Sequence, residues 1–311
     1  MKHLYTVVKN LFCILPVLLL AACTSTAPVT TPAGFDWQGH RGCRGILPEN
    51  SIPAFLRALD FPEVTTLELD LAVSKDNQLI VSHEPWFNPV ICQHPNGDSV
   101  RVAEAEKLLI FQKTVAEIRE YDCGSRGNPR FPEQQKMKTY KPTLQEVVTA
   151  VHAQKTNRTP IIRWNIEIKS EPAWDGVRHP AVETFANLVL AEISALGIAQ
   201  QCVIQSFDVR PLQYIHQKNP AITLALLIEN VNSLENNLQT LGFQPHIYSP
   251  YYQLVSKKLV RKCQKLNMKL IPWTVNDPKD MRALIHLGVN GIITDYPNRI
   301  REVSAGGQEK K

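Results

Sequence analysis

The sequence lacks the signatures of several common functional classes. No C-x-x-C pair occurs among its seven cysteines, which argues against a structural zinc site or a thioredoxin-like centre. No G-x-G-x-x-G opens a first helix and no Walker-type loop is present, so a dinucleotide-binding sheet and a P-loop enzyme have no support. The net charge is only +5, and Lys and Arg form no basic stripe that alternates with aromatic residues. We therefore expect no nucleic-acid partner.

The first 22 residues have the order of a bacterial lipoprotein signal. A positive start at Lys2 and Lys9 precedes an apolar run, residues 11–22, that is shorter than the span of about 20 residues needed to cross a membrane. The motif Leu20-Ala21-Ala22-Cys23 resembles a lipobox, which implies cleavage before the cysteine and its lipidation. Residues 23–34, rich in Thr, Pro and Ala, are expected to form a flexible tether. An ordinary signal peptide or an uncleaved anchor is the alternative.

Lipidation would place the folded part outside the cytoplasm. Thr24, rather than Asp, follows the lipobox cysteine, and the same resemblance then implies the outer membrane, with the protein facing the periplasm. Once Cys23 carries lipid and the signal has been removed, five cysteines remain, so at least one thiol stays unpaired. Cys92 and Cys123 bracket one loop-rich stretch and are the favoured disulfide pair.

Short apolar runs alternate with helical patterns from residue 35 to residue 303. Eight runs are predicted as strands, at residues 36–41, 66–73, 161–168, 202–207, 222–228, 246–249, 269–275 and 291–294. Helices are predicted at residues 50–60, 114–121, 143–153, 181–196, 211–218, 233–241, 256–267 and 278–287. This α/β rhythm favours a TIM (β/α)₈ barrel over a doubly wound open sheet.

One stretch interrupts the alternation and another ends it. Residues from about 85 to 140 are rich in Pro, Gly, Asn and charge, and we interpret them as an insertion after the second strand, too short and polar for a good core. Residues 304–311 are predicted to be a polar tail.

Three carboxylates fall on predicted strands of this barrel. Glu68 and Asp70 lie two residues apart in one strand, so both side chains point to the same face. Alone, this pair fits the solvent face of an amphipathic strand. In a barrel, however, Glu167 at the end of the next strand can join them at one rim. Because adjacent like charges are costly without a cation, and oxygen ligands favour hard ions, we predict a Ca²⁺ or Mg²⁺ site.

The same rim receives two histidines and positive charge. His40 and Arg41 close the first predicted strand, His83 follows the second, and Lys169 follows the third. Imidazoles titrate near neutrality and suit proton transfer. The cationic side chains suit an anionic substrate that bridges to the metal.

Six motifs, in this order, resemble the signature of the glycerophosphodiester phosphodiesterases: His40-Arg41-Gly42, Pro48-Glu49-Asn50, Glu68-x-Asp70, Val81-Ser82-His83-Glu84, Ile166-Glu167-Ile168-Lys169 and Thr294-Asp295-Tyr296-Pro297. The resemblance spans about residues 37–299. It implies a TIM barrel that hydrolyses deacylated phospholipids to glycerol 3-phosphate and an alcohol.

The resemblance also implies roles for individual residues. His40 and His83 would form the acid–base pair, and Arg41 and Lys169 would hold the phosphate. Calcium or magnesium would bind to the three carboxylates named above. The insertion would cover the site and help to choose the substrate.

Other residues are expected to support these groups. Glu49 is expected to orient Arg41 or a histidine, and Asp295 to have a supporting or structural role. Trp273 either stacks on the glycerol or head group or caps the barrel. Glu84 stands where the family usually has Asp, for which we expect a shifted hydrogen bond and retained activity.

Two other functions fit parts of the pattern. A lysophospholipase D or a phosphatidylinositol phospholipase C-like enzyme would use the same barrel and histidine pair. A non-catalytic lipoprotein that binds phosphodiesters is the other alternative, but the intact histidines and carboxylates favour an enzyme.

Overall fold

The computed structural model describes residues 29–154 and 161–305. The expected signal, the lipidation site at Cys23 and residues 306–311 of the predicted tail lie outside the described residues. Within the described range, no helix combines the length and the apolar character needed to cross a membrane.

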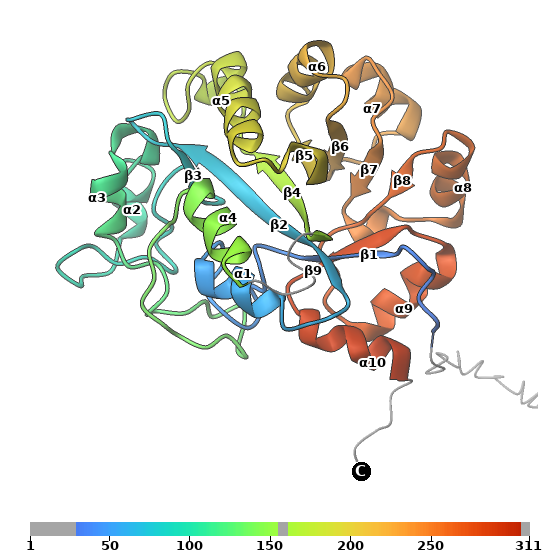
Figure 1. Cartoon of the computed structure of the whole chain (residues 1–311), viewed down its shortest axis with the longest axis horizontal. Helices are drawn as coiled ribbons and strands as arrows, with labels where there is room; N and C mark the ends of the chain where they lie inside the picture. Colours follow the sequence, from blue (N-terminus) through green and yellow to red (C-terminus); the bar gives the residue numbers. More distant parts are fainter. Residues whose placement is uncertain (1–28, 155–160, 306–311) are drawn as a thin grey trace, which may run out of the picture.

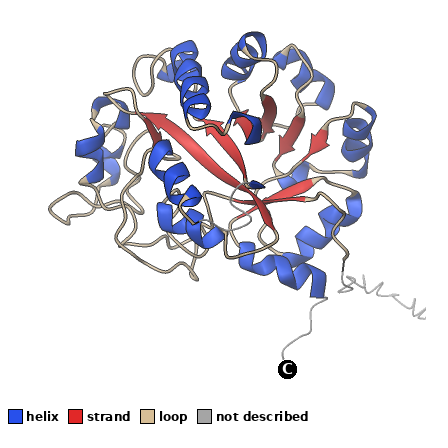
Figure 2. Cartoon of the chain, viewed as in Figure 1, coloured by secondary structure: helices blue, strands red, loops and turns tan. Residues whose placement is uncertain are grey.

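Eight parallel strands form a nearly closed barrel, and helices surround it (Figures 1 and 2). They pair in the order β8-β7-β6-β5-β4-β2-β1-β9. The strands are β1 (Asp36–Gly39), β2 (Val64–Val73), β4 (Arg163–Ile168), β5 (Cys202–Ser206), β6 (Thr223–Ile228), β7 (Ile247–Pro250), β8 (Lys269–Leu270) and β9 (Gly291–Thr294). The predicted TIM barrel is confirmed.

The seam between β8 and β9 is closed by irregular backbone. The strand predicted at 269–275 ends early, because Pro272 has no N–H with which to continue a regular ladder. Backbone hydrogen bonds still cross the seam. Ile293 N–H donates to the Pro272 carbonyl at 3.0 Å, and Val275 N–H donates to the Ile293 carbonyl at 2.9 Å.

The helices follow the predicted rhythm to within a few residues at most ends. Those of the barrel are α1 (Ile52–Ala58), α4 (Leu144–His152), α5 (Val182–Ala195), α6 (Val209–Lys218), α7 (Leu234–Leu241), α8 (Lys257–Lys265), α9 (Pro278–Leu287) and α10 (Ile300–Ala305). Short 3₁₀ turns are η1 (Ile110–Gln112), η3 (Pro172–Trp174), η4 (Ala199–Gln201), η5 (Tyr252–Leu254) and η6 (Pro297–Arg299). The helix α10 was not predicted, and it begins directly after η6.

Strand alternation decides which side chains reach the site. Along β2, Leu67, Leu69 and Leu71 are fully buried in the core between the barrel and its helices. The intervening Glu68 and Asp70 therefore face the barrel interior, where each is 1% exposed. The solvent-face alternative for these two carboxylates is thus excluded.

The insertion has more internal structure than we predicted. After β3 (Leu79–Val81), which pairs antiparallel with β2, come the short helices α2 (Val102–Ala105) and α3 (Val115–Arg119). Apolar residues that are scattered through this segment, among them Phe87 and Ile118, gather against Ala72 of β2 and Ile80 of β3. The expectation that the insertion has no good core was wrong, because the two strands supply the missing apolar surface.

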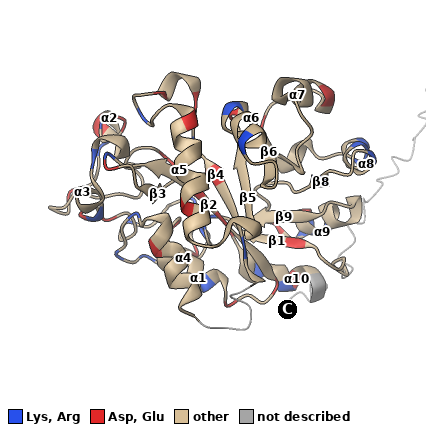
Figure 3. Cartoon of the chain, turned by 45° about the horizontal axis from the view of Figure 1, so that its top comes forward, with Lys and Arg blue, Asp and Glu red and all other residues tan. Residues whose placement is uncertain are grey.

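The end of the expected tether contacts the barrel. Val29 is buried, and its N–H donates to the carbonyl of Val303 in α10 at 3.3 Å. Among the described residues, Lys and Arg positions are interspersed with Asp and Glu over helices and loops, in agreement with the scattered charge in the sequence (Figure 3).

Candidate active site

A cavity of about 810 Å³ opens where the parallel strands end. Eight of the candidate site residues from the sequence line it: His40, Arg41, Glu68, His83, Glu167, Lys169, Trp273 and Asp295. Their sequence positions are far apart, but parallel strands bring their carboxyl ends to one rim. The barrel therefore assembles the predicted site residues around one space.

The three predicted metal ligands form a compact cluster. Each of Glu68, Asp70 and Glu167 offers a carboxylate oxygen, and these oxygens lie within 4.8 Å of one another. Their proximity follows from the register of two neighbouring strands, in which Asp70 pairs directly with Glu167. All three residues are buried.

The electrostatics of this cluster fit a bound cation. Burial, with the charge of Asp70 beside it, raises the pKa of Glu68 well above its usual range. Burial likewise raises the pKa of Glu167 to about 7. Asp70 Oδ1 is buried and has no hydrogen-bond donor among the described residues. A hard divalent ion would relieve both the repulsion and this unpaired oxygen, so the residues fit Ca²⁺ or Mg²⁺.

Asp70 is the most firmly ionised member of the cluster. Burial opposes its ionisation, but Arg41, His83 and Lys169 outweigh that cost and hold its pKa well below the usual range. The side chain of Asn50 also donates to Asp70 Oδ2 at 2.8 Å. Negative charge is thus maintained at the centre of the cluster.

His40 is oriented by a carboxylate from the last strand. Its Nδ1 lies 2.6 Å from Asp295 Oδ1. Burial, with Arg44 acting in the same direction, lowers the pKa of His40 to about 4, so the ring is neutral near pH 7. A neutral ring donates its Nδ1 hydrogen to Asp295, which leaves Nε2 as the atom available to the cavity, 3.9 Å from Glu68 Oε2.

His83 is held in the same manner by its neighbour. Its Nδ1 lies 3.0 Å from Glu84 Oε1, and Asn88 Nδ2 donates to the same oxygen at 3.1 Å. Burial, with Arg41 and Lys169, lowers the pKa of His83. Glu84 thus makes a hydrogen bond to the histidine, while the predicted shift of that bond and the retained activity stay predictions.

The two residues predicted to bind phosphate both form ion pairs with carboxylates of the site. Arg41 donates through Nη1 to Glu49 Oε1 at 2.8 Å, and its Nε lies 3.1 Å from Asp70 Oδ2. Of the two partners considered for Glu49, Arg41 or a histidine, the structure shows Arg41. Lys169 Nζ donates to Glu167 Oε1 at 2.8 Å. Arg41 Nε is buried and makes no hydrogen bond among the described residues, although it lies close to the Asp70 carboxylate.

Two cationic residues at the site were missed by sequence reasoning. Arg44 lines the cavity and donates through Nε to Asp295 Oδ1 at 2.8 Å. Lys141, which follows the insertion, is buried and donates to Ser82 Oγ at 2.8 Å, while that hydroxyl donates to the Glu84 carbonyl at 2.6 Å. No local sequence pattern marks either residue as part of the site, because the partners of both are distant in the sequence and meet them only in the folded chain.

Trp273, the aromatic residue predicted at this rim, is hydrogen-bonded to the barrel and also lines the cavity. Trp273 Nε1 donates to the carbonyl of Ser249 at 2.9 Å, so the barrel holds the indole nitrogen. The residue also lines the cavity beside Phe207. Both alternatives considered for Trp273, capping and contact with a ligand, are compatible with this position.

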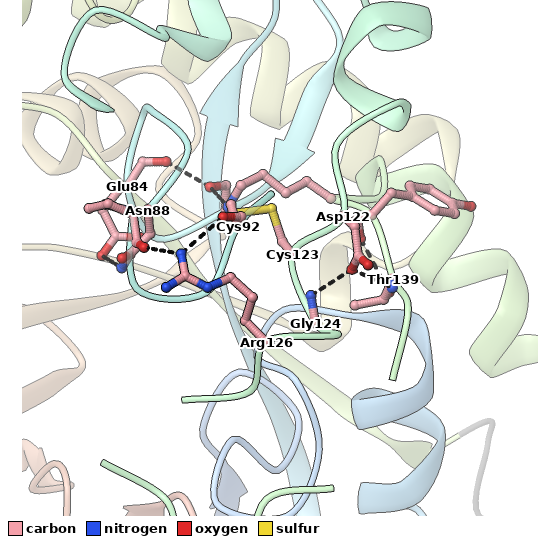
Figure 4. Close-up of a disulfide and its surroundings, with 12 residues drawn as sticks. Glu84, Asn88, Cys92, Asp122, Cys123, Gly124, Arg126 and Thr139 are labelled. Carbon is pink, nitrogen blue, oxygen red and sulfur yellow. Dashed lines mark hydrogen bonds between the residues drawn. A yellow bond between two sulfur atoms is a disulfide. The ribbon is translucent and has the colours of Figure 1, made fainter. Parts of the chain in front are cut away.

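The predicted disulfide is confirmed, and it lies near Glu84, the residue that is hydrogen-bonded to His83 (Figure 4). Cys92 and Cys123 are bonded across 31 residues of sequence. The N–H of Cys92 donates to the carbonyl of Asn88 at 2.9 Å, and the side chain of Asn88 binds Glu84. The crosslink thereby restrains the loop that positions Glu84.

Comparisons with known proteins agree with this site. The model of the glycerophosphoryl diester phosphodiesterase family matches residues 40–299. A glycerophosphodiester phosphodiesterase from Caldanaerobacter subterraneus subsp. tengcongensis is 29% identical over 269 residues, which cover 86% of this chain and 97% of that protein.

Solved structures show the same architecture. A crystal structure of a Silicibacter pomeroyi DSS-3 protein assigned to the glycerophosphoryl diester phosphodiesterases has a TM-score of 0.78 at 26% identity, covering 90% of this chain and 96% of that one. An Oleispira antarctica phosphodiesterase in complex with its product sn-glycerol-3-phosphate has a TM-score of 0.66 at 18% identity, covering 88% and 96%. The second likeness concerns the fold.

Proposed function

Because the chain belongs to the glycerophosphoryl diester phosphodiesterase family, we propose that it hydrolyses glycerophosphodiesters to glycerol 3-phosphate and an alcohol. The observation that carries this proposal is the shared cavity. Glu68 and Glu167 line it, with Asp70 clustered beside them, and so do two histidines that are each hydrogen-bonded to a further carboxylate. Phosphodiester hydrolysis needs both features, because negative charge must be neutralised and protons must move at two oxygens.

We propose that Glu68, Asp70 and Glu167 hold one divalent cation, Ca²⁺ or Mg²⁺. When bound, such an ion polarises the phosphoryl oxygens and offsets the charge that develops in the transition state. The buried oxygen of Asp70 that accepts no hydrogen bond from the described residues and the raised pKa of Glu167 support this assignment.

The histidines are the proposed proton-transfer groups. One imidazole removes a proton from the attacking oxygen, which belongs to water or to the neighbouring glycerol hydroxyl. The other gives a proton to the alcohol oxygen as its bond to phosphorus breaks. If the glycerol hydroxyl attacks, a cyclic phosphate forms and is then hydrolysed. In either route, Asp295 and Glu84 hold the rings of His40 and His83 and stabilise the imidazolium state.

Substrate phosphate is proposed to bind between the acid cluster and the cations. Arg41 lines the cavity beside the acids, and Lys169 Nζ lies at the edge of the cluster, 4.0 Å from Asp70 Oδ1. Both side chains line the cavity or border its acids, so they can contact the non-bridging oxygens.

We also propose that lipid on Cys23 anchors the enzyme to the outer membrane, facing the periplasm. The lipobox-like Leu20-Ala21-Ala22-Cys23 supports this assignment. The disulfide of the insertion suits an oxidising compartment.

The direct test is release of glycerol 3-phosphate from glycerophosphodiesters by the purified protein supplied with Ca²⁺ or Mg²⁺. Wild type should release it, and His40→Ala and His83→Ala should each lower turnover by on the order of 10²-fold or more. Unchanged melting temperatures of both variants would show that the fold is intact. Turnover confined to an acylated lysophospholipid would instead identify a lysophospholipase D, and the absence of any turnover would refute the enzyme assignment.

A further inference from the structure

One buried lysine near the site has no part in the proposed reaction. Lys141 is 7% exposed, and in the part of the chain that the structure describes its ammonium forms one hydrogen bond, donated to Ser82 Oγ at 2.8 Å, and no ion pair. Burial lowers the pKa of Lys141, although the charges of Glu84 and Glu49 act in the opposite direction. Because a buried ammonium without an ion pair is costly, the position calls for a role that an apolar side chain could not fill.

The backbone around Lys141 fixes it beside the end of β3. Val81 N–H donates to the carbonyl of Pro142 at 2.8 Å, and Ile80 forms an antiparallel bridge with Thr143. Thr143 is also the N-cap of α4. The segment that leads into α4 therefore lies against β3, and it brings the lysine next to the serine that follows this strand.

The ammonium of Lys141 determines the direction of the Ser82 hydroxyl. An ammonium has donors only, so Ser82 Oγ must accept from it and is left to give its own hydrogen elsewhere. That hydrogen goes to the carbonyl of Glu84 at 2.6 Å. The N–H of Ser82 donates to the carbonyl of Asp70 at 2.9 Å, which attaches the same residue to β2. The hydrogen bonds from Lys141 through Ser82 to Glu84 thus close a turn of three residues.

The middle residue of this turn is His83, the second proposed proton-transfer group. Its ring lines the cavity, and its Nδ1 lies 3.0 Å from Glu84 Oε1, so the turn holds both the histidine and the carboxylate that orients it. Burial opposes the ionisation of Glu84, but His83, Lys141 and Arg41 outweigh that cost and hold the pKa of Glu84 well below its usual range. Lys141 therefore acts on this turn through a hydrogen bond and through its charge.

We infer that Lys141 is a positioning residue for His83, because it holds the turn of residues 82–84 through the Ser82 hydroxyl and so keeps the imidazole in place for proton transfer. The inference rests on the proposed function. Lys141 is not among the residues that line the cavity, so its loss should lower kcat and leave KM nearly unchanged. The histidine would still have its bond to Glu84, so we expect a fall in kcat on the order of tenfold.

The test replaces the ammonium and keeps an apolar stem. In Lys141→Met we expect the kcat for release of glycerol 3-phosphate to fall on the order of tenfold, with KM within about twofold of wild type. Lys138→Met, at an exposed position of the same segment, is the matched control and should keep both constants. Melting temperatures report whether each variant is folded. Ser82→Ala interrupts the same hydrogen bonds at the hydroxyl and should lower kcat by a similar factor.

A second readout separates positioning from a merely structural role. Added to His83→Ala, the Lys141→Met change should lower the residual kcat by less than about twofold, because the group that the lysine positions is gone. Added to His40→Ala, it should still lower kcat on the order of tenfold. Loss of general stability would instead lower the residual kcat of both histidine variants alike.

A kcat of folded Lys141→Met within about threefold of that of Lys138→Met would overturn the inference, as would equal losses in the two histidine variants. If Lys141→Met does not fold, Ser82→Ala decides by the same threshold. In each of these cases wild type would still release glycerol 3-phosphate, so the proposed function would stand. Absence of release by wild type would refute the proposed function and this inference with it.

Discussion

At the scale of single residues, Asp295 controls the first histidine of the site. It accepts from Arg44 and Asn276 and lies 2.6 Å from His40 Nδ1. His40 and Arg44 outweigh its burial and hold the pKa of Asp295 well below the usual range, so the carboxylate stays charged. That charge is what would stabilise a protonated imidazole during turnover.

Replacing this charge should impair the reaction without removing the side chain. Asp295→Asn keeps the size of the group but cannot stabilise imidazolium, and we expect kcat to fall by on the order of 10²-fold. Steady-state release of glycerol 3-phosphate measures the effect. Asp208→Asn, at the N-cap of α6, is a comparison at a carboxylate outside the cavity and should retain kcat. A kcat for Asp295→Asn within a factor of three of wild type would contradict the role of this residue.

The residue scale also shows what the sequence can and cannot predict. His40, His83 and the three clustered carboxylates were identified because short motifs fix their types and spacings. That they converge follows from the fold, because the carboxyl ends of the strands of a (β/α)₈ barrel meet at one rim. Lys141 was missed because its partner is 59 residues away, and no local pattern marks a lysine whose ammonium becomes buried beside Ser82.

At the scale of elements, the insertion is a second small core attached to the barrel. Its apolar side chains pack against β2 and β3, and one disulfide closes it. The pairing of Cys92 with Cys123 was favoured from the sequence, but this core was not expected, because β2 runs on for ten residues and offers apolar surface beyond the barrel. Such surface is visible only once the strand pairing is known.

Removing the disulfide should destabilise the insertion and make the position of His83 less well defined. Closure of a loop of about 30 residues is worth roughly 3–4 kcal/mol, so the double variant Cys92→Ser, Cys123→Ser should unfold at lower denaturant concentration. Because Asn88 links the crosslinked loop to Glu84, kcat should fall several-fold as well. A reductant should reproduce both effects in wild type and add nothing in the double variant. Equal unfolding midpoints with and without the crosslink would contradict the assigned role of the disulfide.

At the scale of the whole molecule, the described chain is one barrel whose rim carries the groups of the proposed reaction. Its N-terminal side is expected to connect to a lipid anchor. Because Val29 packs on α10, the tether that leaves the barrel begins before that residue. If Cys23 carries lipid, the chain between that residue and the barrel is therefore shorter than the tether predicted at residues 23–34.

Loss of the proposed lipid anchor should release the enzyme from the membrane without changing its activity. Cys23→Ala removes the acceptor thiol, and we expect the protein to leave the membrane fraction while its kcat stays that of wild type. Labelling with a radioactive fatty acid and fractionation of the envelope measure this outcome. Incorporation of label into Cys23→Ala, or membrane binding equal to wild type, would exclude lipidation at this residue.

The central claim is that three buried carboxylates at one rim hold a divalent cation without which the phosphodiester is not cleaved. Release of glycerol 3-phosphate after complete chelation, followed by titration with Ca²⁺ or Mg²⁺, tests it most directly. We predict that chelation abolishes release in wild type, that saturable addition of one of the two ions restores it, and that Glu167→Gln requires on the order of tenfold more ion. Undiminished release by the chelated enzyme would contradict the claim.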